Sequence, residues 1–174
     1  MGWLSDLWKY GFTAEQRARS RGAKRYVQAI TAYEQELAGL PAPDARTQAE
    51  RVIASPRFIR IVPWPAPRPA RPELAPAVGA FFRAVQRVEV PDGETCADAA
   101  DLASLEWAPG FMRLGPDGEH THLALRPGDE AIYVLGDDVP AEERVVTVLA
   151  TVYHWILYLE RRAELLAEPD PPTA

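Results

Sequence analysis

The chain has 174 residues, of which 47% are hydrophobic and 25% are charged, and its formal net charge is -6. These are ordinary values for a globular protein of one domain, and they exclude a chain that is disordered throughout. The single cysteine, Cys96, excludes a framework of internal disulfides, and no run of about 18 apolar residues predicts a membrane span. We therefore expect a cytoplasmic protein.

The N-terminal region predicts a long helix preceded by an apolar strip. Thr13 and Gln16 have the spacing of a capping box, and apolar residues then recur at helical spacing, which predicts a helix over residues 13–37. Several arginines crowd the first half of this helix, as on a solvated helical face or a docking surface. The apolar strip within residues 3–12 is predicted to pack on its own domain, with contact to a membrane surface or a partner as the alternative.

The middle of the chain predicts two further helices separated by a strand and a proline-rich segment. A helix is expected over 44–54 and a strand over 57–62. Residues 63–72 carry five prolines, which remove backbone donors and restrict the residues before them, so this segment, here called the strap, is expected to be extended. A short amphipathic helix follows over 73–85.

The second half changes to a twofold apolar period, which is typical of short strands joined by tight turns. The predicted strands are 87–90, 111–114, 121–125 and 131–135. A last helix is predicted from 141 to about 167, because Val145, Val148, Leu149 and later apolar residues recur at helical spacing.

This order of elements predicts an α+β fold with an antiparallel sheet of about four to six strands, flanked by helices and closed by a long C-terminal helix. The organisation expected along the chain is a basic, mostly helical region, the strap, an α+β region and a flexible tail, all within one structural domain. Their bounds are 1–62, 63–72, 73–167 and 168–174.

His120 and His122 are the only closely spaced histidines. On a strand they share a face, so both could bind one metal ion with Asp117 or Glu119 as a further ligand. Two histidines exposed to solvent are the simpler interpretation, and it is the one that we adopt. His154, on the last helix, is interpreted as a hydrogen-bonded structural residue.

Catalytic signatures are lacking elsewhere in the sequence. No serine lies in a nucleophile elbow, and Cys96 has no recognisable flanking signature. The glycines of residues 115–118 are followed by no helix whose N-terminus would receive a phosphate. We therefore predict that the chain is not an enzyme and uses no cofactor or metal.

Charge is divided unevenly along the chain. Residues 1–72 carry 12 Lys and Arg against 6 Asp and Glu, whereas residues 73–174 carry 7 against 19. An acidic surface repels nucleic acid and raises the rate of association with a basic protein. The second half therefore predicts a surface that binds a basic partner, with a solvated acidic surface as the alternative.

Three segments of the second half contain short motifs that occur in a known order. Residues 74–83 have a leucine and a proline before a helix with paired apolar residues, 107–125 contain two strands joined by Gly-Pro-Asp-Gly, and 131–138 form a third strand with an Ile-Tyr pair. Over residues 73–160 this arrangement resembles the SUKH superfamily. The Asn-Gly pair that often follows the first helix of that family is absent, and residues 1–60 have no counterpart in it.

The resemblance implies an α+β fold and, for many bacterial members, service as immunity proteins that neutralise toxins delivered by contact, frequently nucleases. An inhibitor needs no catalytic group, and it associates faster with a basic toxin if its own surface is acidic. The predicted contact surface consists of carboxylates on turns and at a helix start, with Tyr133 and His120 as anchors. The carboxylates are Asp117, Glu119, Asp129, Glu130, Asp137, Asp138, Glu142 and Glu143.

The alternative function is a non-enzymatic scaffold or regulatory protein that docks through the N-terminal helix and the strap. The predicted partner is a protein in either case, neither nucleic acid nor a spanned membrane is expected, and a homo-oligomer is compatible with the sequence.

Overall fold

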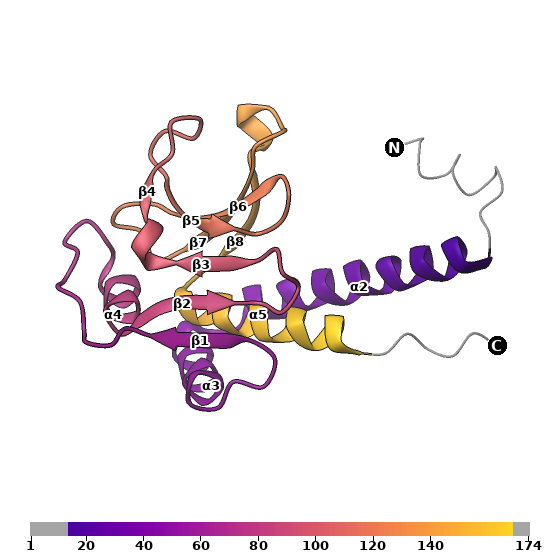
Figure 1. The fold of residues 1–174 in the computed structure, drawn as a ribbon, viewed down its shortest axis with the longest axis horizontal. Helices are drawn as coiled ribbons and strands as arrows, with labels where there is room; N and C mark the ends of the chain where they lie inside the picture. Colours follow the sequence, from indigo (N-terminus) through magenta and orange to yellow (C-terminus); the bar gives the residue numbers. More distant parts are fainter. Residues whose placement is uncertain (1–13, 169–174) are drawn as a thin grey trace.

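The computed structural model describes residues 14–168, which form two antiparallel sheets with helices packed around them (Figure 1). The predicted α+β class is confirmed, although the strands divide between two sheets instead of forming one. The apolar strip at 3–12, the capping residue Thr13 and the tail from residue 169 lie outside the described residues.

The elements follow one another in the order that Figure 1 shows. The helices are α2 (Ala14–Gly39), α3 (Ala42–Ala54), α4 (Pro76–Ala84) and α5 (Val152–Ala167), with single 3-10 turns η1 (Ala99–Asp101) and η2 (Ala141–Glu143). The first sheet has the order β1 (Arg60–Pro63), β2 (Val85–Glu89), β3 (Cys96–Asp98). The second sheet has the order β4 (Ala103–Ser104), β5 (Met112–Pro116), β6 (Thr121–Leu125), β7 (Ile132–Gly136), β8 (Val145–Leu149).

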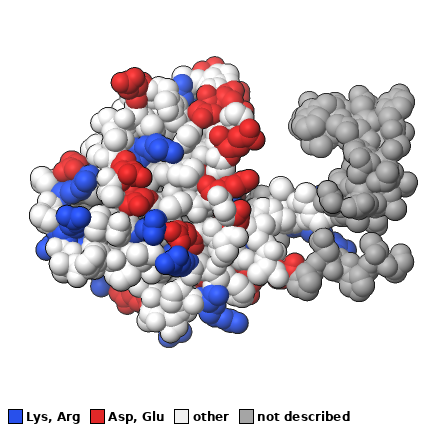
Figure 2. All heavy atoms as spheres, in the orientation of Figure 1, with Lys and Arg blue, Asp and Glu red and all other residues white. Residues whose placement is uncertain are grey.

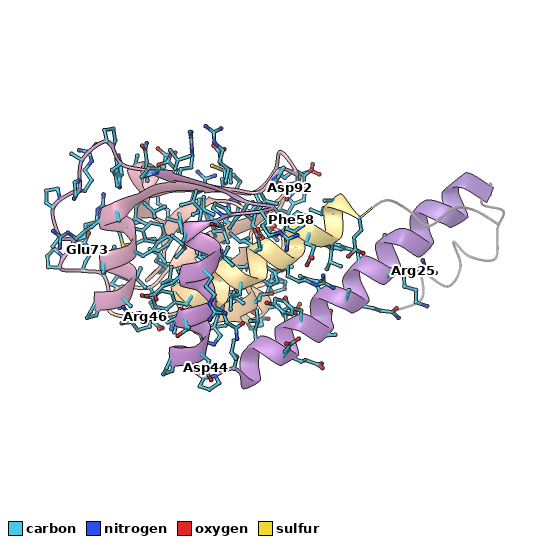
Figure 3. The ribbon with its side chains drawn as sticks, turned by 90° about the horizontal axis from the view of Figure 1, so that it is seen from below. Arg25, Asp44, Arg46, Phe58, Glu73 and Asp92 are labelled. Atoms are coloured by element: carbon cyan, nitrogen blue, oxygen red, sulfur yellow. The ribbon has the colours of Figure 1, made fainter. Side chains whose placement is uncertain are left out.

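Helix α2 is only partly covered by the other described elements. Its second half buries Ile30 and Leu37 against the core, whereas its first half extends beyond the sheets (Figure 1). Arg25 is exposed on the extended half and points away from the body of the protein (Figure 3).

The predicted helix over 141–167 is wrong in its first third. Val145 and Val148, which the helical spacing assigned to a buried stripe, lie on the strand β8 and are 42% and 52% exposed. Four of the five residues of β8 are β-branched, and such side chains are restricted in a helix and favoured in a strand. Helix α5 begins only after Thr151, whose hydroxyl accepts a hydrogen bond from the His154 backbone N–H.

Helix α5 supplies the centre of the hydrophobic core. Trp155, Ile156 and Leu159 are fully buried. Burial of three large apolar side chains stabilises the fold by roughly 2 kcal/mol each. His154 is also buried, and its Nε2 donates to the carbonyl oxygen of Leu40 at 2.8 Å, which ties the turn between α2 and α3 to α5. The structural role predicted for His154 is confirmed.

The strap contains no helix and, after Pro63, no strand, and it is held against α4. The backbone N–H of Trp64 donates to Ala84 O at 3.0 Å, the Trp64 indole N–H donates to Phe82 O at 3.0 Å, and the Arg68 N–H donates to Arg83 O at 3.1 Å. The last carbonyls of a helix have no partner within the helix. The strap supplies these partners, so its course is fixed at both Trp64 and Arg68.

The two sheets meet where β5 passes close to β3. Gly115 is buried on β5, and a Cβ atom there would lie 1.8 Å from the backbone oxygen of Cys96 on β3. Just beyond, Thr95 and Asp117 form an isolated antiparallel bridge between the sheets. This close approach needs a residue without a side chain.

Arg162 on α5 lies between a turn of each sheet. Its Nη1 donates to Asp117 Oδ1 at 2.7 Å, and its Nη2 lies 3.4 Å from Asp92 Oδ2. The side chains of Arg162, Asp117 and Asp92 are only 13%, 7% and 13% exposed. Burial alone would raise the pKa of Asp92, but hydrogen bonds from the N–H groups of Thr95 and Glu94, with Arg162 nearby, hold that pKa below its usual value.

We expect Arg162→Leu to lower the free energy of unfolding by about 3–5 kcal/mol, because it leaves buried carboxylates without their cation. The matched control is Arg161→Leu on the same helix, where the arginine is 35% exposed and pairs with Glu164. Loss of such a surface pair costs less than about 1 kcal/mol. Chemical denaturation of both variants measures the difference, and equal losses would contradict the role assigned to Arg162.

We expect Gly115→Ala to lower the free energy of unfolding by about 3 kcal/mol, because the new Cβ would collide with backbone rather than with a movable side chain. Gly79→Ala in α4 is the control, since its Cβ would lie 3.7 Å from Leu74 Cβ, an ordinary contact. Replacing a glycine inside a helix raises stability by about 0.5–1 kcal/mol. Denaturation midpoints that move in the same direction for both variants would contradict this account.

Candidate partner-binding surface

One end of the five-stranded sheet gathers six of the predicted contact residues. The register of β6 and β7 pairs Thr121 with Gly136, so the turn before β6 lies beside the turn after β7. The Asp137 N–H donates to the His120 carbonyl at 3.1 Å across these turns. The carboxylates gathered here, which we call the acidic end, are Glu119, Asp137, Asp138, Glu142 and Glu143, with His120 beside them.

All five carboxylates of the acidic end are exposed. Figure 2 shows Asp and Glu gathered over this end of the molecule, at the top of the view. Among the side chains that the structure describes, no Lys or Arg lies within ion-pair distance of any of the five. Within the described structure, Lys and Arg therefore leave all five charges without an ion pair, and only Asp137 has both carboxylate oxygens bonded within the fold.

Asp137 is held between the two histidines that the sequence analysis singled out. Its Oδ1 lies 3.2 Å from His120 Nδ1 and its Oδ2 lies 2.7 Å from His122 Nε2, and because a carboxylate only accepts, both imidazole nitrogens donate. The hydrogen bond from His122 is the main cause that holds the pKa of Asp137 below its usual value. Asp137 thus fixes the histidines to the turn after β7.

An aromatic residue missed by the sequence analysis borders the acidic end. The Trp107 ring lies 5.3 Å from the His122 ring, and the Arg144 guanidinium lies over Trp107 at 5.3 Å from its centroid. Trp107 belongs to the loop between β4 and β5, which packs on the outer face of the five-stranded sheet and encloses a second apolar cluster with Phe111 and Leu135. In the sequence, the only sign of this residue's position was a tryptophan next to a predicted strand.

Apolar side chains also lie next to the acidic end. Val145, Val146 and Val148 are 42%, 57% and 52% exposed on β8, which is the last strand of its sheet. An edge strand has unpaired backbone groups and is a place where another chain can add a strand. The sequence analysis missed this edge because it assigned these valines to a helix.

Four predicted contact residues do not belong to the acidic end. Asp117 is buried against Arg162. Asp129 and Glu130 lie on the turn between β6 and β7, at the opposite end of those strands, where Glu130 accepts from a backbone N–H in the first turn of α4 at 3.5 Å. Tyr133 is buried, and its hydroxyl donates to Asp129. The ten predicted residues therefore do not form one patch.

Within residues 22–168, whose side chains the structure describes, no three or more His, Cys, Asp and Glu side chains are arranged to hold a metal ion. Burial raises the pKa of the Cys96 thiol, so less of the reactive thiolate is present. None of the helices over these residues is long and apolar enough to cross a bilayer.

Comparison of the chain with protein-family models, with curated proteins and with solved structures gives no significant match in any of the three. The resemblance to the SUKH superfamily therefore stays a prediction that rests on the three segments described above.

We expect the pKa of Asp137 to rise toward its usual value in His122→Ala, and to rise less in His120→Ala, whose hydrogen bond is longer. A folded-state pKa below the unfolded value stabilises the fold above the unfolded pKa, and this contribution is lost as the pH falls through the folded pKa. The free energy of unfolding should therefore increase less between about pH 2 and pH 5 in His122→Ala than in the unaltered protein. Carbon NMR of the labelled carboxyl group measures the pKa, and an unchanged value would contradict the pairing.

Proposed function

We propose that this protein is a bacterial immunity or inhibitor protein that binds and neutralises a basic protein toxin through the acidic end. One observation carries the proposal: five exposed carboxylates without a described Lys or Arg partner lie beside the exposed valines of the edge strand β8. A surface that binds another protein combines apolar area, which contributes affinity, with charged groups, which raise the association rate and contribute specificity.

The distribution of the charges favours a basic partner. Opposite charges raise association rates by 10-fold to 1,000-fold at low salt. Arg144, which precedes β8 at this end, is half-buried, lies over Trp107 and forms no described ion pair with the five carboxylates. The resemblance to immunity proteins adds the class of partner, a toxin, and an inhibitor that acts by occlusion requires no catalytic group of its own.

The test uses the product of the reading frame adjacent to the gene as the candidate toxin. The double variant Glu142→Lys and Glu143→Lys should slow association by at least about tenfold at low salt, with a smaller difference at high salt, because it reverses the charge that steers the encounter. The control reverses two exposed carboxylates on α3, Asp44→Lys and Glu50→Lys, and should change the rate little. Surface plasmon resonance measures the rates, and growth during toxin expression measures protection.

A second arm of the same experiment tests the apolar edge. Val146→Lys places a charge on β8, whereas Val27→Lys places one on α2 at a valine with the same 57% exposure. Only Val146→Lys should speed dissociation of the complex. Absence of binding or of protection by the unaltered protein, or equal effects of the matched variants, would refute the proposal.

A further inference from the structure

The strap, α4 and η1 line a cavity of about 390 Å³ that is open to solvent. It lies on the side of the molecule where the strap runs, at the left of Figure 1, away from η2 and the acidic end. Its apolar lining comes from the buried Leu74 and Phe82 and from the half-buried Trp64. Cavities of about 300–1,000 Å³ with mainly apolar walls are typical of sites for small molecules.

Three arginines also line this cavity: Arg68, Arg71 and Arg83. They come from the strap and from the last turn of α4, and all three are exposed. Figure 2 shows blue side chains gathered on this side of the molecule. One carboxylate is close, since Glu73 lies 3.8 Å from Arg71, and Figure 3 places Glu73 at the end of the strap.

Two of these guanidinium groups are held in place by the fold. The Arg68 N–H donates to Arg83 O at 3.1 Å and Arg83 Nε donates to Arg68 O at 3.1 Å, so the two residues bond reciprocally. The Arg68 guanidinium lies over the Trp64 ring, 4.2 Å from its centroid. Fixed donors lose less conformational entropy when a ligand binds than free side chains do.

Arg68 and Arg83 have no acidic partner within the described structure. Neither Arg68 nor Arg83 lies within ion-pair distance of any carboxylate whose position the structure describes. A guanidinium binds carboxylate, sulfonate or phosphate oxygens with paired, charge-assisted hydrogen bonds.

We propose that this cavity binds a small organic anion with an apolar, aromatic body. The body would contact Leu74 and Phe82, and the anionic group would accept hydrogen bonds from Arg68 and Arg83. Three arginines lie around one cavity that also has apolar walls, and such a site suits a small anion with an apolar body better than the extended phosphate backbone of a nucleic acid. This site does not depend on the function proposed for the acidic end.

The test compares two probes that share an aromatic body and differ in charge. They are 8-anilinonaphthalene-1-sulfonate, an anion, and N-phenyl-1-naphthylamine, which is uncharged. The full chain should bind the anion with a stoichiometry of one, measured by fluorescence titration, and more tightly than the uncharged probe. Arg68→Gln with Arg83→Gln should weaken binding of the anion by about tenfold or more and leave the uncharged probe almost unaffected.

Two further variants locate the site. Arg46→Gln with Arg51→Gln on α3 makes the same change of charge on exposed arginines outside the cavity and should leave both probes unaffected. Gly79→Leu projects a side chain into the cavity from α4, where a Cβ is accommodated, and should abolish binding of both probes. Thermal unfolding of each variant shows that it is folded.

Three results would overturn the proposal. The first is that the full chain does not bind the anion. The second is that the cavity variants and the α3 variants weaken binding of the anion equally. The third is that either probe still binds to Gly79→Leu. The last of these would mean that the probe binds elsewhere on the protein.

Discussion

The buried guanidinium of Arg162 determines how the two sheets fit against α5. Removing a cation from water costs several kcal/mol unless charged partners come with it, and here the partners come from different sheets. Asp92 follows β2 in the first sheet, and Asp117 follows β5 in the second. Burial would lower the pKa of Arg162, but Asp117 and nearby tyrosines raise it above its usual value, so the group remains a cation. The close passage at Gly115 is what brings both turns within its reach.

Other polar side chains of α5 fix distant parts of the chain in the same way. The Glu160 carboxylate accepts from the backbone N–H groups of three successive residues, 57–59, before β1, at 3.1 to 3.2 Å. Figure 3 shows Phe58 and Asp92 together beside the second half of α5. His154 holds the turn at Leu40 from the first half of the helix. Asp117 joins the turn before β6 to this framework, whereas no described hydrogen bond links Asp138, Glu142 or Glu143 to α5.

Local patterns predicted most helices and strands where the apolar residues fitted only helical or only strand spacing. They failed at residues 145–149, where the apolar residues fitted both. The helices α2, α3 and α4 and most strands followed from spacing and turn residues. Val145, Val148 and Leu149 match a helical stripe, yet the β-branched run that contains them forms an edge strand. Asp117 occupies a turn and was predicted to be exposed; its partner Arg162 is 45 residues away, and no local pattern reveals such a pairing. The sequence predicted the exposed carboxylates of η2 correctly, because the exposure of charged residues in a turn depends on neighbouring residues and not on a distant partner.

Charge that is segregated along the sequence is not segregated in the same way in space. The acidic end comes entirely from the second half of the chain, but the cationic cavity combines Arg68 and Arg71 of the basic half with Arg83 of the acidic half. Salt at physiological concentration screens exposed charges beyond about 8 Å. A ligand at either place therefore responds to the few charges around it rather than to the net charge of -6. One small fold can then present opposite local charges to a basic protein and to a small anion.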